Sequence, residues 1–209
     1  AHAAAQIADG SLVANHADDP IDAPSADGAT PLFLAAKGGH LECTRILLDA
    51  RANVADATSA GFTPLFVAAL RGKSQVVCLL LEQYGVAVDQ AAEDGRTPLY
   101  AACESGSVEC VRALIGAGAS LESRRSDDTT PLIVASYFGH AGVVELLLLN
   151  GAKLSPRDED GHALDNARAQ GKAQCVELLR QALADRGMSE ADLREAGELV
   201  AAACVRMCT

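Results

Sequence analysis

The chain has 209 residues, a length that suits one compact domain or one array of repeats. Hydrophobic residues make up 49% of it, enough for a sizeable core, but aromatic residues make up only 3% and tryptophan is absent. The core must therefore consist mainly of Leu, Val, Ile and Ala. The net charge of −11 argues against binding to nucleic-acid phosphates or to an anionic membrane surface, because both need clustered Lys and Arg.

The sequence also indicates a compartment. No apolar stretch reaches the length of about 18 residues that a membrane-spanning helix needs, so we expect no membrane insertion. The first six residues contain no basic segment or cleavage-like pattern, so we expect no signal peptide there. The seven cysteines are an odd number and none form a CxxC pair, which favours a reducing compartment. We therefore expect a cytoplasmic protein, with the nucleus as the alternative.

A short motif recurs along the chain. Gly-x-Thr-Pro-Leu begins at Gly28, at Gly61 and at Gly95. A further copy that begins at Asp128 has lost the glycine, and a degenerate copy begins at Gly161. The leucines that end these copies are separated by 33, 34, 33 and 32 residues: Leu32, Leu65, Leu99, Leu132 and Leu164. Such a period is typical of a repeat array.

Each copy favours a helix that begins at its Thr-Pro pair. Threonine is a good N-cap, and proline suits the first helical position, where its missing N–H costs nothing. About nine residues later comes a glycine that suits the left-handed end of a helix. These glycines are Gly39, Gly72, Gly106, Gly139 and Gly171. A second, leucine-rich helix and a turn follow each glycine.

This period and these motifs resemble the ankyrin repeat over residues 27–183. The resemblance implies an all-α solenoid, in which helix–turn–helix units stack side by side and β-turn fingers project at right angles. We expect a degenerate capping repeat at 1–26 and four full repeats at about 27–58, 59–92, 93–125 and 126–159, with Tyr84 as an insertion. A C-terminal capping repeat at 160–184 and a C-terminal helix within 185–209 follow.

The C-terminal segment predicts an amphipathic helix over 189–207. Ser189 and Asp192 form a capping-box-like start, and apolar residues follow at helical spacing. Such a helix either packs on the last repeat as a cap or binds a partner.

Motifs for catalysis and cofactor binding are absent: we find no GxSxG, P-loop, HExxH or GxGxxG. The run from Asp158 to Gly161 superficially resembles a calcium loop but lacks the remaining ligands. Cys204 and Cys208 alone make a poor zinc site. Three cysteines at one equivalent repeat position are expected to be small core residues of the outer helices: Cys43, Cys110 and Cys175. We expect no enzyme activity, no cofactor and no metal.

The resemblance implies that a partner lies in the groove between the inner helices and the fingers. The two residues before each helix-ending glycine and the residue after each turn glycine face this groove. Aromatic, leucine and charged residues at these positions form the predicted contact set: Phe62, Leu70, Arg71, Arg96, Glu104, Tyr137 and Phe138. Phe33, Phe66 and Tyr100 are instead expected to be buried between neighbouring inner helices.

Charges are unevenly placed on the fingers. Arg124 and Arg125 form a secondary finger patch, whereas other fingertips carry acidic residues such as Asp89 and Glu93. These are either ordinary solvated loops or a steering pattern for a partner that has a basic segment and an acidic or phosphorylated residue.

The function expected from these features is non-catalytic binding of another protein or peptide, as a scaffold, adaptor or inhibitor, by a monomer. Two alternatives are a regulatory domain of a larger enzyme or channel, and an assembly chaperone that holds a subunit transiently. A long-lived stoichiometric complex would count against the chaperone.

Overall fold

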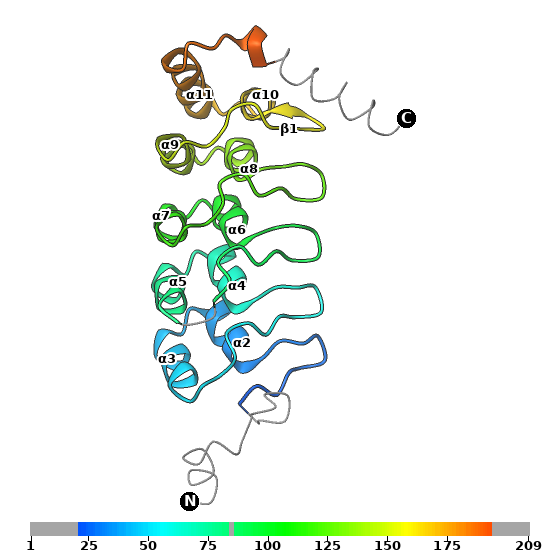
Figure 1. The fold of residues 1–209 in the computed structure, drawn as a ribbon, viewed down its shortest axis with the longest axis vertical. Coiled ribbons are helices and arrows are strands. Elements are labelled where there is room, and N and C mark those ends of the chain that lie inside the picture. Colours follow the sequence, from blue (N-terminus) through cyan, green and yellow to red (C-terminus); the bar gives the residue numbers. More distant parts are fainter. Residues whose placement is uncertain (1–20, 84–85, 194–209) are drawn as a thin grey trace, which may run out of the picture.

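The computed structural model describes residues 21–83 and 86–193. Helix pairs stack along one axis, with the inner helices in one column, the outer helices in a second, and the finger loops projecting beyond the inner column (Figure 1). The inner helices are α2 (Pro31–Gly38), α4 (Pro64–Leu70), α6 (Pro98–Ser105), α8 (Pro131–Phe138) and α10 (Ala163–Ala169). The outer helices are α3 (Leu41–Asp49), α5 (Ser74–Leu81), α7 (Val108–Gly116), α9 (Ala141–Leu149) and α11 (Ala173–Asp185).

The all-α solenoid is confirmed. One helix pair falls within each range predicted for a repeat from residue 27 onward, although α11 ends at Asp185, just beyond the expected boundary. The repeat boundaries themselves stay a prediction. Residues 1–20 of the capping repeat predicted at 1–26, the inserted Tyr84 and positions 194–207 of the expected C-terminal helix lie outside the described residues.

The start and end signals of the inner helices act as the sequence predicts. The Oγ1 atoms of four N-cap threonines accept a hydrogen bond from the amide N–H three residues later, at 3.1–3.4 Å: Thr30, Thr63, Thr97 and Thr130. Gly39 and Gly139 end α2 and α8 with φ of 76° and 85°, in the left-handed region that glycine adopts without strain.

The last repeat departs from this pattern. His162 takes the N-cap place, and its backbone N–H donates to Oδ2 of Asp165 at 3.1 Å. In the finger before it, β1 (Arg157–Asp158) pairs antiparallel with β2 (Gly161–His162). This short hairpin is a local addition to the helical architecture and fixes the shape of the last finger.

The core lies between the two helix columns. The motif leucines are 0–3% exposed: Leu32, Leu65, Leu99, Leu132 and Leu164. Phe33, Phe66 and Tyr100 are buried, as predicted. A single helix pair could not cover these side chains, so each repeat depends on its neighbours for stability.

Carboxylates join the turns of adjacent repeats. Asp22 accepts from the backbone N–H of Asn53 at 3.0 Å, and Asp89 accepts in the same way from Ser120 at 3.0 Å. The carboxylate of Glu122 accepts from the backbone N–H of Lys153 at 2.9 Å. These bonds span 31 residues each and fix the stacking of the turns.

The prediction for the cysteines was wrong at one position. Cys110 and Cys175 are buried, but Cys43 is exposed. In the first described repeat no described outer helix packs against the side of α3 that faces away from α5. Ile46 on α3 is exposed as well.

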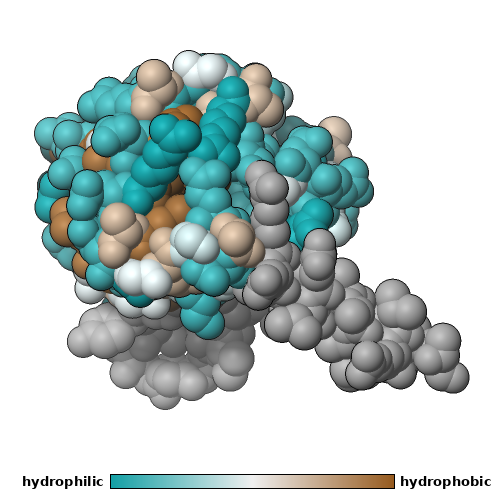
Figure 2. Space-filling view, turned by 90° about the horizontal axis from the view of Figure 1, so that it is seen from above, coloured by the Kyte–Doolittle hydropathy of each residue, from teal (hydrophilic) through white to brown (hydrophobic). Residues whose placement is uncertain are grey.

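The C-terminal end of the described chain packs on the last repeat. Leu193 joins the core, and the ion pair between Arg168 and Glu190 ties this segment to α10. Asp192 donates its backbone N–H to the Oγ atom of Ser189 at 3.2 Å, which confirms the capping start. Seen along the long axis, the described surface is mostly hydrophilic, with apolar side chains showing between the polar ones (Figure 2).

Candidate functional site

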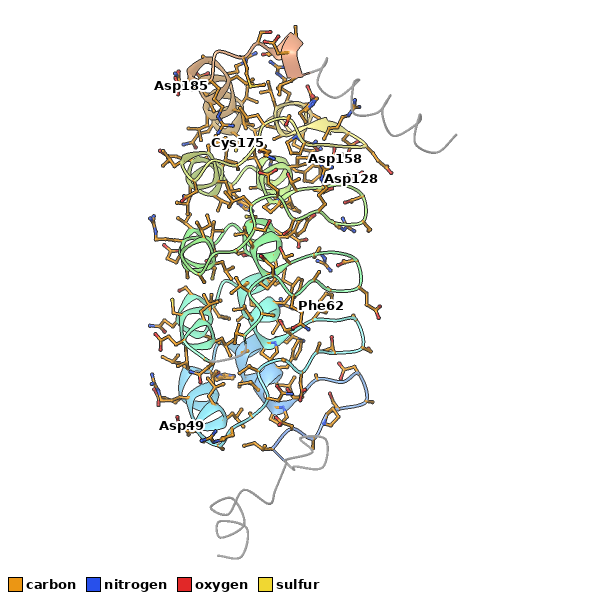
Figure 3. All side chains as sticks on the ribbon, in the orientation of Figure 1. Asp49, Phe62, Asp128, Asp158, Cys175 and Asp185 are labelled. Atoms are coloured by element: carbon orange, nitrogen blue, oxygen red, sulfur yellow. The ribbon has the colours of Figure 1, made fainter. Side chains whose placement is uncertain are left out.

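A hollow of about 330 Å³ opens between the inner helices and the fingers of the C-terminal half. Its lining comes from α6, α8, the start of α10 and the two fingers that precede α8 and α10. Figure 3 shows Asp128 and Asp158 on this finger side, whereas Asp49 and Asp185 lie on the side of the outer helices. The residues around the hollow are Tyr100, Glu104, Arg125, Asp127, Thr129, Ile133, Val134, Tyr137, Phe138, Asp158, Glu159, Asp160 and Asn166.

Two aromatic side chains at the end of α8 form one wall. Tyr137 is 39% exposed and Phe138 is 44% exposed, and their rings meet edge to face with centroids 5.3 Å apart. Phe138 also stacks on the ring of His140 at 6.0 Å. The Nε2 atom of His140, the N-cap residue of α9, lies 3.1 Å from the carbonyl oxygen of Glu104 in α6. This contact links the two neighbouring repeats. The two rings therefore pack against each other, and Phe138 packs on His140, while each ring keeps part of its surface exposed to solvent.

The floor is formed by Tyr100 and an ion pair from the finger before α8. Burial raises the pKa of Tyr100 to about 12, although the nearby guanidinium of Arg125 opposes this shift. Arg125 donates from Nη1 to Oδ2 of Asp127 at 3.0 Å. Burial alone would raise the pKa of Asp127, but hydrogen bonds from Thr129 and the charge of Arg125 outweigh it and lower that pKa. Asp127 is therefore a carboxylate at neutral pH.

The last finger supplies an acidic rim. Asp158 accepts hydrogen bonds from the side-chain amide of Asn166 at 3.2 Å and from the backbone N–H of Asp160 at 3.0 Å. Glu159 and Asp160 are exposed. Among the described residues that line the hollow, Arg125 is the only cation, against five carboxylates: Glu104, Asp127, Asp158, Glu159 and Asp160. The hollow therefore has a negative potential beside an apolar wall.

The structure brings three members of the predicted contact set together further toward the N-terminus. The guanidinium of Arg96 lies 5.4 Å from the ring centroid of Phe62, and it donates to Asp94 at 2.6 Å and to Glu104 at 3.2 Å. Phe62 stacks on the buried Phe66 with centroids 4.6 Å apart. The charge of Arg96 is thus balanced by carboxylates of the protein itself, and the ring of Phe62 is covered by Phe66 and Arg96.

Of the other predicted residues, Arg125 lines the hollow, whereas Leu70, Arg71 and Arg124 lie apart from it. Leu70 is half-buried against the core. Arg71 is exposed and lines a separate shallow hollow near α2. In the secondary finger patch, Arg124 pairs with Asp128 at 3.0 Å and Arg125 with Asp127 at 3.0 Å, so both charges are balanced within the same finger.

Sequence reasoning missed the contribution of Asp127, Asp158 and Tyr100 to the site. The run from Asp158 to Asp160 was considered only as a calcium loop. Its position in the finger that follows the Tyr137–Phe138 pair is the signal that could have placed it beside those rings. Tyr100 was correctly placed in the core, but it also lines the hollow.

The described residues also bear on metal binding and on the reactivity of the thiols. Over residues 21–83 and 86–193, no cluster of three or more His, Cys, Asp or Glu side chains could hold a metal ion. Burial raises the pKa of the thiols of Cys103, Cys110 and Cys175, which keeps them protonated. None of the described helices combines the length and the apolar character needed to cross a bilayer.

Comparison with known families agrees with the fold. A family model described as ankyrin repeats, in three copies, matches residues 1–92 and again residues 84–158. Ankyrin repeats are generally protein–protein interaction modules and are typically non-catalytic. No curated protein matches the chain.

Proposed function

Since the chain belongs to the ankyrin-repeat family, we propose that it binds a segment of another protein in the groove, without catalysis. The observation that carries this proposal is the pair of rings of Tyr137 and Phe138, about two-fifths exposed at the wall of the hollow. Exposed apolar clusters on a protein surface mark interaction sites, and aromatic anchors commonly supply most of their binding energy.

The geometry favours Tyr137 and Phe138 as the anchors. The two rings at the end of α8 pack against each other, and Phe138 also packs on His140, so little side-chain entropy is lost on binding. Glu104 contributes a carboxylate beside them. Phe62 and Arg96 continue the groove surface as a preformed cluster, and Leu70 and Arg71 extend it toward α2. Whether the protein acts as a scaffold, adaptor or inhibitor then depends on which partner supplies the segment.

A peptide selection tests this function. The full chain is used to select binders from a random peptide library, and dissociation constants of the enriched peptides are measured for variants. We expect Tyr137→Ala with Phe138→Ala to weaken binding by about 2–4 kcal/mol, the usual size for two anchors. The control is Leu149→Ala, which removes a side chain that is 77% exposed on the outer helix α9.

The expected result is loss of affinity in the double variant and unchanged affinity in the control. Equal affinity of the double variant and the wild type would place recognition away from these rings. A library that yields no enriched peptide would contradict binding of an extended segment altogether.

A further inference from the structure

The groove is electrically polarised along its length. At the N-terminal end, Lys37, Arg71 and Lys73 line one shallow hollow together with Leu34. At the C-terminal end, the hollow beside Tyr137 is lined by five carboxylates, of which Glu104 pairs with Arg96 and Asp127 with Arg125. The excess negative charge there comes from Asp158, Glu159 and Asp160. The two ends therefore present opposite charge to anything that lies along the groove.

The basic end consists of solvent-facing charges. Lys37 and Arg71 are exposed at the ends of α2 and α4, and the described residues provide no ion-pair partner for either of them or for Lys73. Asp27 in the first finger interacts electrostatically with Lys37. Among the described residues, the positive charge of this end is therefore only partly compensated.

The acidic end combines charge with an aromatic wall. A Lys or Arg side chain that enters the hollow meets the faces or edges of Tyr137 and Phe138 and the carboxylates of the last finger. Cation–π and ion-pair contacts then act on the same group, in a site that is partly shielded from water. An acidic side chain in this place would face several like charges and would be rejected.

The distance between the ends sets the length of the ligand. Neighbouring packed helices are about 8–10 Å apart, so the three steps from α2 to α8 cover roughly 24–30 Å. An extended chain rises about 3.3 Å per residue and spans this distance with roughly seven to nine residues.

We propose that the groove recognises an extended protein segment whose charge is segregated, with acidic residues at the Lys37–Arg71–Lys73 end and a Lys or Arg against Tyr137 and Phe138. This inference rests on the proposed function and adds to it the chemistry and the orientation of the segment. Complementary potentials at the two ends fix the direction in which the segment lies and speed its association.

Charge-swapped variants of the full chain test this inference in the same random library of 12-residue peptides. One variant is Lys37→Glu with Arg71→Glu, and the other is Glu159→Lys with Asp160→Lys; all four side chains are exposed. The control is Arg45→Glu with Arg112→Glu on the outer helices α3 and α7. It makes the same charge change as the first variant, away from the groove.

With the wild type and the control, we expect enriched peptides with an acidic end and a basic end separated by about seven to nine residues. The first variant should select peptides that are basic at both ends, and the second should select peptides that are acidic at both ends. A peptide selected on the wild type should lose at least tenfold in affinity for either swapped variant, and less at high salt.

Three outcomes overturn the inference. Enriched peptides without segregated charge, which still lose affinity for the Tyr137→Ala/Phe138→Ala variant, refute the charge order and leave the proposed function standing. Enriched peptides whose charge pattern is the same for the wild type and both swapped variants also refute it. Absence of any enriched peptide refutes the proposed function together with the inference.

Discussion

Phe66→Ala should lower the free energy of unfolding by clearly more than Phe138→Ala. Phe66 is 1% exposed, stacks on Phe62 and lies under the guanidinium of Arg96. Its removal leaves a cavity between inner helices, and such a change costs about 3–5 kcal/mol. Phe138 is 44% exposed, so only about half of its surface is buried and solvent fills the space that it leaves. Half of the value for full burial gives about 0.8–1.5 kcal/mol.

Chemical denaturation followed by circular dichroism measures both values. The slope of the unfolding free energy with denaturant should stay the same, so that the shift of the midpoint reports stability alone. The reasoning is refuted if the two variants differ by less than about 1 kcal/mol. Phe138 would then be a core residue, and its role as an exposed anchor would be lost.

Three further predictions concern the turns, the thiols and the C-terminal end. Asp89→Ala should lower stability by about 1 kcal/mol by removing the acceptor for the Ser120 N–H, whereas Asp89→Asn, which keeps an acceptor, should cost less in the same denaturation assay. Under native conditions a thiol reagent should modify Cys43 and Cys78 within the described chain, as read by peptide mass spectrometry. The buried thiols should react only after unfolding, and fast native labelling of any of them would contradict their placement: Cys103, Cys110 and Cys175. The hydrogen bond from Arg168 lowers the pKa of Glu190 in the folded state. The contribution of Glu190 to stability is therefore present above its unfolded pKa of about 4.3 and is lost as the pH falls through the lower folded value. Glu190→Gln should make the unfolding midpoint less dependent on pH between about 6 and 3, and an unchanged profile would show that this ion pair does not contribute.

The fold could be predicted from the sequence because the signals are local and repeat. Threonine caps, the proline after them and left-handed glycines act within a few residues, and the period places the leucines in one core. Cys43 shows the limit of this reasoning. Its repeat position is buried where a preceding outer helix covers it, and in the first described repeat no described helix does so.

The candidate site could be predicted only in part, because contacts between side chains of different repeats depend on their orientation in the folded protein. Groove positions identified Tyr137, Phe138 and Glu104, which the structure places at one hollow. The same positions also gave Phe62 and Arg96, but the arginine lies over the ring and pairs with Asp94 and Glu104. Such pairings depend on side-chain orientation across repeats, which periodicity does not specify.

A crystal structure of the full chain bound to its tightest selected peptide tests the central claim most directly. The account predicts a peptide in the groove, with a Lys or Arg side chain against the rings of Tyr137 and Phe138 and an acidic residue near Arg71. A peptide bound on the outer helices, or one that leaves both rings exposed to solvent, would contradict it.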